Sequence, residues 1–230
     1  LPASSRNKAV FIDFDGVYCN SDVWINGHHL GFRPNGYISF RYEIGPYLHF
    51  DGSNNVIAVK VDNSHQPNSR WYSGSGIYRH VWLTVTGKTH VAYQGTYIST
   101  PVVHREKARI HLETAVLNEN RNQAAAKTVV QTRILDAQGR TLQTISAHLT
   151  LASGDSANVI QDADLPSPHL WSVKDPYLYT ALIRVLVKGV LQEEYQTRFG
   201  IRSFYFDPQK GFFLNGVHLK INGVCDHHDL

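Results

Sequence analysis

Apolar and polar residues alternate with a period of two along almost the whole chain. Ile110 and Leu112, for example, alternate with Arg109, His111 and Glu113, which is the pattern of a strand with one buried face. A second face of this kind holds five apolar residues, Tyr179, Ala181, Ile183, Val185 and Val187. The helical period is weak everywhere, so the pattern predicts a mainly β protein.

The first part of the chain contains six short segments rich in β-branched and aromatic residues, separated by Gly, Asn, Pro and Ser. They are residues 8–14, 22–25, 28–32, 37–42, 54–61 and 80–85. Asn26-Gly27 lies between two of them, and this dipeptide tolerates the two positive φ angles of a type I′ hairpin turn. Many short strands with closely spaced turn signals predict antiparallel β-sandwiches.

The spacing of these signals predicts three domains. Residues 1–88 hold six of the eight strands of a jelly roll, so we expect a partial jelly-roll domain that lacks its opening strands and leaves an edge exposed. Residues 89–198 fit about seven strands, with a turn at residues 136–139, which indicates an immunoglobulin-like sandwich without a disulfide. Residues 199–230 would begin a truncated (β/α)8 catalytic barrel.

The barrel prediction depends on the last thirty residues. Apolar and polar positions alternate around Asn215-Gly216, a second predicted type I′ hairpin. Leu219, Ile221 and Val224 are then expected to form a short strand. Its C-terminal end would present Asp226, His227, His228 and Asp229, and polar groups at the C-terminal end of a strand are typical of an α/β-barrel active site.

Composition excludes several classes of function. Of the 230 residues, 42% are hydrophobic and 18% are charged, which is ordinary for a globular protein, and the net charge is only +3. There is no basic run to suggest a nucleic-acid partner and no apolar stretch of about 20 residues to suggest a membrane span. Cys19 and Cys225 are far apart in sequence, so we expect no disulfide between them, and two thiols alone cannot form a zinc site.

Several separated motifs occur in the order found in glycoside hydrolase family 2. They are FGIR at 199–202, GFFLNG at 211–216, NSRWYSGSGIYRHVWL at 68–83, LWSVKDPYLYTALIRV at 170–185 and DVWINGHHLG at 22–31. The chain thus resembles a β-galactosidase-like member of this family over nearly its whole length. The resemblance implies a fragment with the end of a sugar-binding domain, an immunoglobulin-like domain and the start of the barrel.

The resemblance also implies the chemistry. The parent enzyme would cleave terminal β-galactosides with retention, through one glutamate as acid/base and one as nucleophile. Both glutamates would follow Leu230, so no catalytic residue and no turnover are expected in this chain. His227 corresponds to a histidine that lines the sugar pocket, with Asp226 and Asp229 beside it. Asp226 stands where many relatives have Arg or Leu, which leaves the sugar preference open.

Arg70 and Trp71 are the other candidate substrate-binding residues. An aromatic ring stacks on the apolar face of a pyranose, and an arginine donates hydrogen bonds to its hydroxyls. The resemblance places their loop near the mouth of the active site. The competing interpretation is that Trp71 and Tyr72 only fill a contact between domains.

Two carboxylate dipeptides are rejected as catalytic groups. Asn118-Glu119 has the order of the family's acid/base pair but lies in a polar turn of the second sandwich. Glu193-Glu194 lies on a strand or hairpin edge, where adjacent side chains point apart.

Several alternatives stay open. The chain could be a non-catalytic carbohydrate-binding module or an adhesion-type structural sandwich, and the parent could be a β-glucuronidase or β-mannosidase. A zinc site at His227 and Asp229 is a weaker rival. We expect no cofactor and no metal. The partners would be a β-linked sugar, the missing barrel and a possible second copy of the chain. The compartment, whether cytoplasmic, periplasmic or secreted, is undetermined for a chain expected to be soluble.

Overall fold

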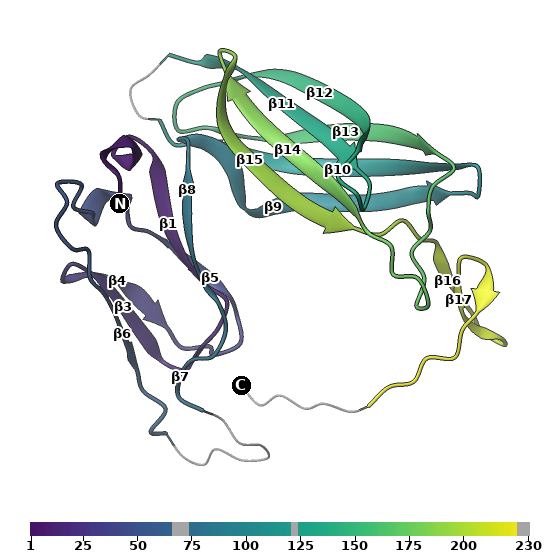
Figure 1. The fold of residues 1–230 in the computed structure, drawn as a ribbon. Coiled ribbons are helices and arrows are strands. Elements are labelled where there is room, and N and C mark those ends of the chain that lie inside the picture. Colours follow the sequence, from purple (N-terminus) through teal and green to yellow (C-terminus); the bar gives the residue numbers. More distant parts are fainter. Residues whose placement is uncertain (66–73, 121–123, 225–230) are drawn as a thin grey trace. The chain divides into compact units, whose positions relative to one another are not determined.

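The computed structural model describes residues 1–65, 74–120 and 124–224. The chain divides into two compact units, Leu1–Gly87 and a second unit that begins at Lys88. Both are built from antiparallel strands, as the period of two predicts (Figure 1). The only helical elements of the described residues are two three-residue 3₁₀ turns, Ala3–Ser5 and Gly45–Tyr47, and neither could cross a membrane.

The first unit is a sandwich of two three-stranded sheets, with strand orders β5-β1-β8 and β4-β3-β6, and a short pair β2-β7. Its core contains apolar residues from both sheets, among them Val10, Ile12 and Phe14 of β1 and Val23 and Ile25 of β3. The strands are β1 (Ala9–Phe14), β2 (Val17–Tyr18), β3 (Ser21–Ile25), β4 (His28–Arg33), β5 (Phe40–Glu43), β6 (Ile57–Val61), β7 (Gly76–Ile77) and β8 (Val81–Thr86).

All six predicted strands of this unit are present, and the hairpin at Asn26-Gly27 is confirmed, since both residues have positive φ angles of 47° and 82°. Two strands begin three residues later than predicted, at Phe40 in place of 37 and at Ile57 in place of 54. The strand expected at 37–42 begins at Phe40, because the side chain of Asn35 accepts a hydrogen bond from the amide of Tyr37 and fixes a turn there. The two-residue strands β2 and β7 were not predicted, because so short a pair has no periodic pattern.

The second unit is a seven-stranded sandwich, the number predicted from its length. One sheet has the order β13-β10-β9 and the other β12-β11-β14-β15 (Figure 1). Seven strands divided three and four between two sheets are typical of an immunoglobulin-like sandwich. The strands are β9 (Thr89–Val103), β10 (Lys107–Asn118), β11 (Ala126–Leu135), β12 (Thr141–Leu151), β13 (Ser156–Pro166), β14 (Tyr179–Val187) and β15 (Val190–Phe199).

Apolar residues at every second position of β10 and β14 form the core of this sandwich. On β10 every second residue is buried, and Ile110 and Leu112 are completely inaccessible to solvent. On β14 the predicted face is also confirmed, because Ile183 and Val185 are fully buried. The sandwich therefore fills its core by packing alone, without a disulfide.

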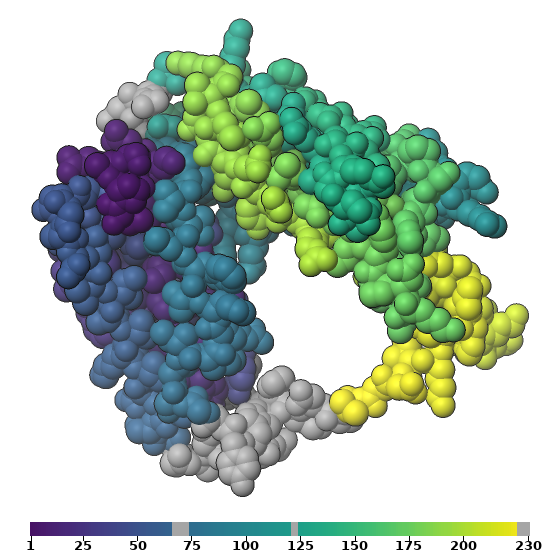
Figure 2. Space-filling model, in the orientation of Figure 1, coloured from purple at the N-terminus to yellow at the C-terminus, as the bar shows by residue number. Residues whose placement is uncertain are grey.

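The end of the described chain forms a small sheet, which Figure 2 shows in yellow as a lobe on the second unit. It contains β16 (Phe204–Asp207), β17 (Gly211–Leu214) and β18 (Val217–His218). The predicted turn at Asn215-Gly216 is confirmed by positive φ angles of 50° and 77°. The prediction of a further strand at Leu219 to Val224 is wrong. The amide of Leu219 donates to the carbonyl of Phe212 on β17 at 2.9 Å, but none of the described residues 219–224 is part of a strand.

Candidate functional site

The five predicted substrate-binding residues all lie outside the described part of the chain. Arg70 and Trp71 fall within 66–73, and Asp226, His227 and Asp229 fall within 225–230. The structure does describe the residues that lead into and out of the first segment. These residues show how the polypeptide is fixed on either side of Arg70 and Trp71.

Hydrogen bonds hold both sides of this segment. Asp62 follows β6 and its carboxylate accepts hydrogen bonds from the amide and the hydroxyl of Ser64, at 3.0 and 2.6 Å. The side-chain amide of Asn63 donates to the hydroxyl of Ser75 on the far side of the segment, at 3.2 Å. Asn20 donates to the carbonyl of Asp62, at 3.0 Å. The residues before and after 66–73 are therefore hydrogen-bonded to each other, and Asp62 is also hydrogen-bonded to Asn20 in the turn before β3.

Hydrogen bonds also set the protonation state of Asp62. The hydrogen bonds from Ser64 lower the pKa of Asp62 below its ordinary value, so its carboxylate is ionised at neutral pH. Cys19 lies beside it, and burial together with the charge of Asp62 raises the pKa of the Cys19 thiol. A thiol with a raised pKa is a poor nucleophile. The residues on either side of 66–73 therefore serve to anchor the polypeptide by hydrogen bonds.

Asn118 of the rejected dipeptide Asn118-Glu119 is a structural residue. Its side chain is buried at the end of β10, where its amide donates to the carbonyl of Ala152 at 2.8 Å. Its side-chain oxygen accepts a hydrogen bond from the hydroxyl of Thr89, at 3.2 Å. These contacts join three segments of the sandwich.

Glu119 belongs to an ion pair with a buried histidine. His90 is 2% exposed, and its Nε2 lies 3.2 Å from a carboxylate oxygen of Glu119. Its Nδ1 lies 2.8 Å from the carbonyl of Val91. Burial by itself would lower the pKa of His90, but Glu119, the carbonyl and Glu193 outweigh it and raise this pKa. Because both ring nitrogens face acceptors, the cationic form of His90 fits this position best.

The two carboxylates of the second rejected dipeptide point apart, as predicted for neighbours on a strand. Glu193 accepts a hydrogen bond from the amide of Val91 at 2.6 Å, while Glu194 pairs with Arg184 at 3.2 Å. Their separate partners leave them no common substrate position, so they do not form the carboxylate pair of a retaining glycosidase.

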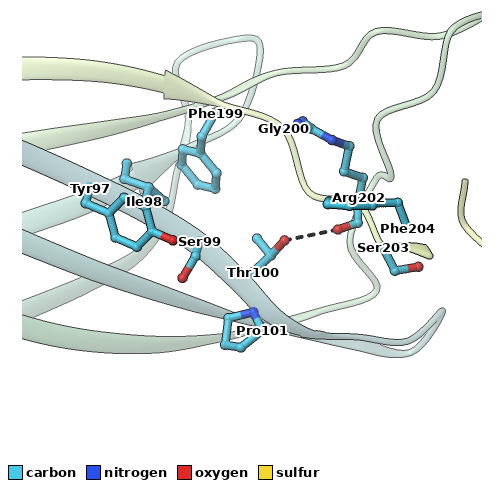
Figure 3. A pocket seen from close by; sticks show the side chains of 10 residues that line it. All are labelled: Tyr97, Ile98, Ser99, Thr100, Pro101, Phe199, Gly200, Arg202, Ser203 and Phe204. Atoms are coloured by element: carbon cyan, nitrogen blue, oxygen red, sulfur yellow. Dashed lines mark hydrogen bonds between the residues drawn. The ribbon is translucent and has the colours of Figure 1, made fainter. Parts of the chain in front are cut away.

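A cavity of about 490 Å³ opens on the second unit between β9 and the segment that follows β15 (Figure 3). Its walls hold aromatic rings, hydroxyl groups and one guanidinium. The lining residues are Tyr97, Ile98, Ser99, Thr100, Pro101, Phe199, Gly200, Arg202, Ser203 and Phe204. This volume lies within the range of about 300–1,000 Å³ that is usual for small-molecule sites.

The wall after β15 is held by specific contacts. The carbonyl of Ile201 accepts a hydrogen bond from the amide of Trp171 at 2.8 Å. The carbonyl of Arg202 accepts one from the hydroxyl of Thr100 at 3.2 Å. Gly200 lies against Trp171, and a Cβ at this position would come within 2.9 Å of the Trp171 side chain. Only glycine lets the segment pass this close.

Sequence reasoning did not find this cavity. Its residues lie about a hundred positions apart, and a single sequence does not show which distant segments meet. One local signal was available. Pro101 lies inside the observed strand β9, and proline in a strand marks an edge or a bulge, which is where β9 shifts its register against β10.

Comparison with known proteins places the whole chain in one family. Residues 89–202 match the family model described as glycosyl hydrolases family 2. The chain is 47% identical over 227 residues to the β-galactosidase BoGH2A of Bacteroides ovatus, covering 99% of the chain and 26% of that protein. It is 30% identical over 243 residues to a β-glucuronidase of Formosa agariphila, covering 97% of the chain and 24% of that protein.

A solved structure gives the same result. The crystal structure of a glycosyl hydrolase family 2 member from Bacteroides cellulosilyticus matches with a TM-score of 0.92 and 36% identity, covering all of the chain and 31% of that protein. The chain thus spans 24–31% of the length of these relatives. Identity over nearly the whole chain and a common fold agree with the motifs at 68–83, 170–185 and 199–216. The chain belongs to glycoside hydrolase family 2.

Proposed function

We propose that this chain is part of a retaining glycoside hydrolase that cleaves terminal β-galactosides. The observation that carries the proposal is the 47% identity, over 99% of the chain, to a β-galactosidase. In this proposal residues 1–88 are a sugar-binding domain, residues 89–198 are an immunoglobulin-like domain and residues 199–230 begin the catalytic barrel.

The proposed reaction uses two carboxyl groups about 5 to 5.5 Å apart. One protonates the leaving oxygen and the other forms a glycosyl intermediate, which water then hydrolyses with retention. We place both glutamates in a part of the polypeptide that follows Leu230. The contribution of this chain is substrate binding, with Trp71 stacking on the sugar and Arg70 donating to its hydroxyls. His227, Asp226 and Asp229 would line the same pocket.

The anchoring at Asp62, Asn63 and Ser75 supports the role of Arg70 and Trp71. A binding loop is effective when its ends are held in place, because less conformational entropy is lost when the sugar binds. The hydrogen bonds at both sides of 66–73 supply such anchors.

A β-glucuronidase is the second candidate, because a relative of that name is 30% identical over 97% of the chain. The two activities differ in whether the sugar carries a carboxylate at C6. Trp71 could stack on either sugar, so the choice depends on the other residues of the pocket.

The proposal is tested by comparing this chain with the longer polypeptide encoded by the same gene. The longer protein should hydrolyse p-nitrophenyl β-galactoside faster than the β-glucuronide, and NMR should show that the first-formed galactose is the β anomer. The 230-residue chain alone should be inactive. A longer protein that prefers the glucuronide would replace the first candidate by the second, and one that cleaves neither would reject both.

A further inference from the structure

The hairpin of the small sheet β16–β18 is held on the second unit through the backbone of Trp171. Trp171 lies in the connection between β13 and β14, which Figure 1 shows beside β16 and β17. Its amide donates to the carbonyl of Ile201 at 2.8 Å, and its carbonyl accepts a hydrogen bond from the side-chain amide of Asn215 at 2.9 Å. Both backbone polar groups of Trp171 are thus bonded to the polypeptide that follows β15.

Asn215 lies in the turn of this hairpin, and its side chain bonds two other segments at once. Its Oδ1 accepts a hydrogen bond from the amide of Ser203 at 3.0 Å, while its Nδ2 donates to the carbonyl of Trp171. Within the described chain, the bond to Trp171 is the only hydrogen bond between residues 204–218 and the sandwich. The side chain of Asn215 is therefore placed to set the orientation of the hairpin.

The backbone of the turn does not by itself require asparagine at position 215. Asn215 has a positive φ angle of 50°, and glycine or aspartate is also common at this position of a type I′ turn. Glycine would offer neither a donor nor an acceptor. An ionised aspartate would accept from Ser203 but could not donate to Trp171. Of these three residue types, only asparagine combines the turn geometry with both hydrogen bonds.

Two other turns of the chain separate the side chain from the backbone geometry. At Asn26-Gly27 in the first unit, Oδ1 of Asn26 accepts from the amide of Val56 and Nδ2 donates to the carbonyl of Tyr47, both at 2.8 Å. At Lys188-Gly189, between β14 and β15, both φ angles are again positive. The side chain of Lys188 makes no hydrogen bond or ion pair with a described residue. The double bond to neighbouring segments therefore comes from asparagine and not from the turn type.

We propose that Asn215 is a positioning residue that fixes the first hairpin of the catalytic domain on the immunoglobulin-like domain. Its role in the reaction rests on the proposed function, in which His227 lines the sugar pocket. His227 follows Asn215 by twelve positions along the chain. A hairpin that rotates on the sandwich would hold this binding residue loosely. Affinity for the sugar would then fall, because the residue has to be ordered when the sugar binds.

The first test measures the orientation of the hairpin in the 230-residue chain by NMR. Asn215→Gly keeps a residue that adopts positive φ angles and removes both side-chain hydrogen bonds. Cross-strand NOEs between β16 and β17 should remain. The amide of Trp171 should exchange with solvent about tenfold faster, because its bond to Ile201 is no longer supported by the neighbouring bond to Asn215.

Asn215→Asp is the second variant. It keeps the acceptor for Ser203 and loses the donor to Trp171, so it should speed the exchange of Trp171 to a similar extent. It also replaces Asn215→Gly if that variant fails to fold.

Lys188→Gly is the matched control. It makes the same kind of replacement at the same position of a turn in the same unit, but it removes no side-chain hydrogen bond to a described residue. The amide of Trp171 should exchange in this variant as it does in the native chain.

The second test measures steady-state kinetics of the longer protein with p-nitrophenyl β-galactoside. Asn215→Gly should raise KM about fivefold to tenfold and change kcat by less than about twofold, because both proposed glutamates follow Leu230. A purely structural role would instead reduce the fraction of folded enzyme. That loss would lower the apparent kcat and leave KM unchanged.

Equal exchange of the Trp171 amide in the native chain, Asn215→Gly and Asn215→Asp would overturn the role of Asn215 in fixing the hairpin. An unchanged KM in the longer protein would overturn its role in sugar binding. A longer protein without β-galactosidase activity would reject the proposed function, and the exchange of Trp171 would still decide whether Asn215 fixes the hairpin.

Discussion

The two sandwiches have the same alternating pattern but differ in how well they cover their inward faces. In the second unit Ile110 and Leu112 of β10 and Ile183 and Val185 of β14 face inward and are fully buried. In the first unit β8 pairs with β1, which places Val81, Leu83 and Val85 opposite the core residues of β1. These inward residues of β8 are nevertheless 36–52% exposed. Alternation decides which face a side chain occupies, whereas burial depends on whether another strand covers that face.

A similar difference is found at β6, the edge of the other sheet in the first unit. Ile57 lies opposite the fully buried Ile25 and faces inward with it, yet Ile57 is 42% exposed. Exposed inward residues therefore occur on both sheets of this unit. The edge strand β15 of the second unit differs, because its inward residues Glu193, Tyr195 and Thr197 are half-buried and Phe199 is buried in the core.

The largest effect should come from truncating the same residue type in each unit. Leu112→Ala removes a fully buried side chain and should lower the free energy of unfolding of the second unit by about 2–5 kcal/mol. Leu83→Ala removes a half-exposed side chain and should cost the first unit about 0.5 kcal/mol or less. Urea unfolding followed residue by residue by NMR measures both. Equal costs would contradict the difference in coverage.

Replacing a turn glycine by alanine should lower hairpin stability by the same amount in both units. Gly27→Ala and Gly216→Ala each place a Cβ on a residue with φ near 80°, and neither Cβ would meet an atom within 4 Å. Each should lower the stability of its hairpin by about 1–2 kcal/mol through the left-handed backbone alone. Hydrogen exchange of the flanking strands measures this cost. A much larger loss at one hairpin would show that its turn depends on more than local geometry.

The buried histidine makes the stability of the second unit depend on pH. The folded pKa of His90 is raised, so its contribution is complete below its unfolded pKa of about 6.5 and is lost as pH rises through the folded pKa. Glu119→Gln should therefore destabilise the unit by about 1 kcal/mol at pH 6, a value reduced because Glu119 is partly exposed. The difference should shrink towards pH 9.

Glu106→Gln is the control for this prediction. It removes the same charge from an exposed position whose side chain makes no hydrogen bond or ion pair with a described residue. Thermal unfolding of both variants and of the native chain from pH 6 to pH 9 makes the comparison. A loss for Glu119→Gln that stays constant over this range would contradict the assignment of His90 as the titrating partner.

A lysine introduced on β8 should have the smallest effect on stability. Its effect on self-association should be larger. An apolar edge strand can pair with another chain, and lysine on an edge discourages such pairing. Leu83→Lys should change the free energy of unfolding by at most about 0.5 kcal/mol and reduce the mass measured by light scattering at high concentration. Leu142→Lys, at a comparably exposed position on β12, the edge strand of the second unit, tests whether the effect is specific to β8; an equal fall in mass would assign the association to both edges. A native chain that is monomeric throughout would contradict this prediction.

Much of the fold was predictable because it depends on local patterns. The faces of β10 and β14, the seven strands of the second unit and the turns at Asn26-Gly27 and Asn215-Gly216 all follow from alternation and backbone preference. The strand expected at Leu219 to Val224 does not form. Its apolar residues carry the right pattern, but a strand also needs neighbours to satisfy its backbone hydrogen bonds.

The sites were less predictable. His227, Asp226, Asp229, Arg70 and Trp71 stay predictions, because they lie outside the described residues. The cavity at Tyr97 and Arg202 arises from a tertiary contact between segments about a hundred residues apart, which no local pattern indicates. The ion pair of His90 with Glu119 was missed for the same reason.

Hydrogen exchange on two edge strands tests most directly whether the inward faces of the two units differ in how well they are covered. In both β8 and β15 the comparison uses only amides that donate to the neighbouring strand, so both sets are hydrogen-bonded and both lie at a sheet edge. The β8 amides should exchange at least tenfold faster than those of β15, because water reaches the inward side of β8. Equal protection of the two strands would contradict it and would show that the first sandwich is as well closed as the second.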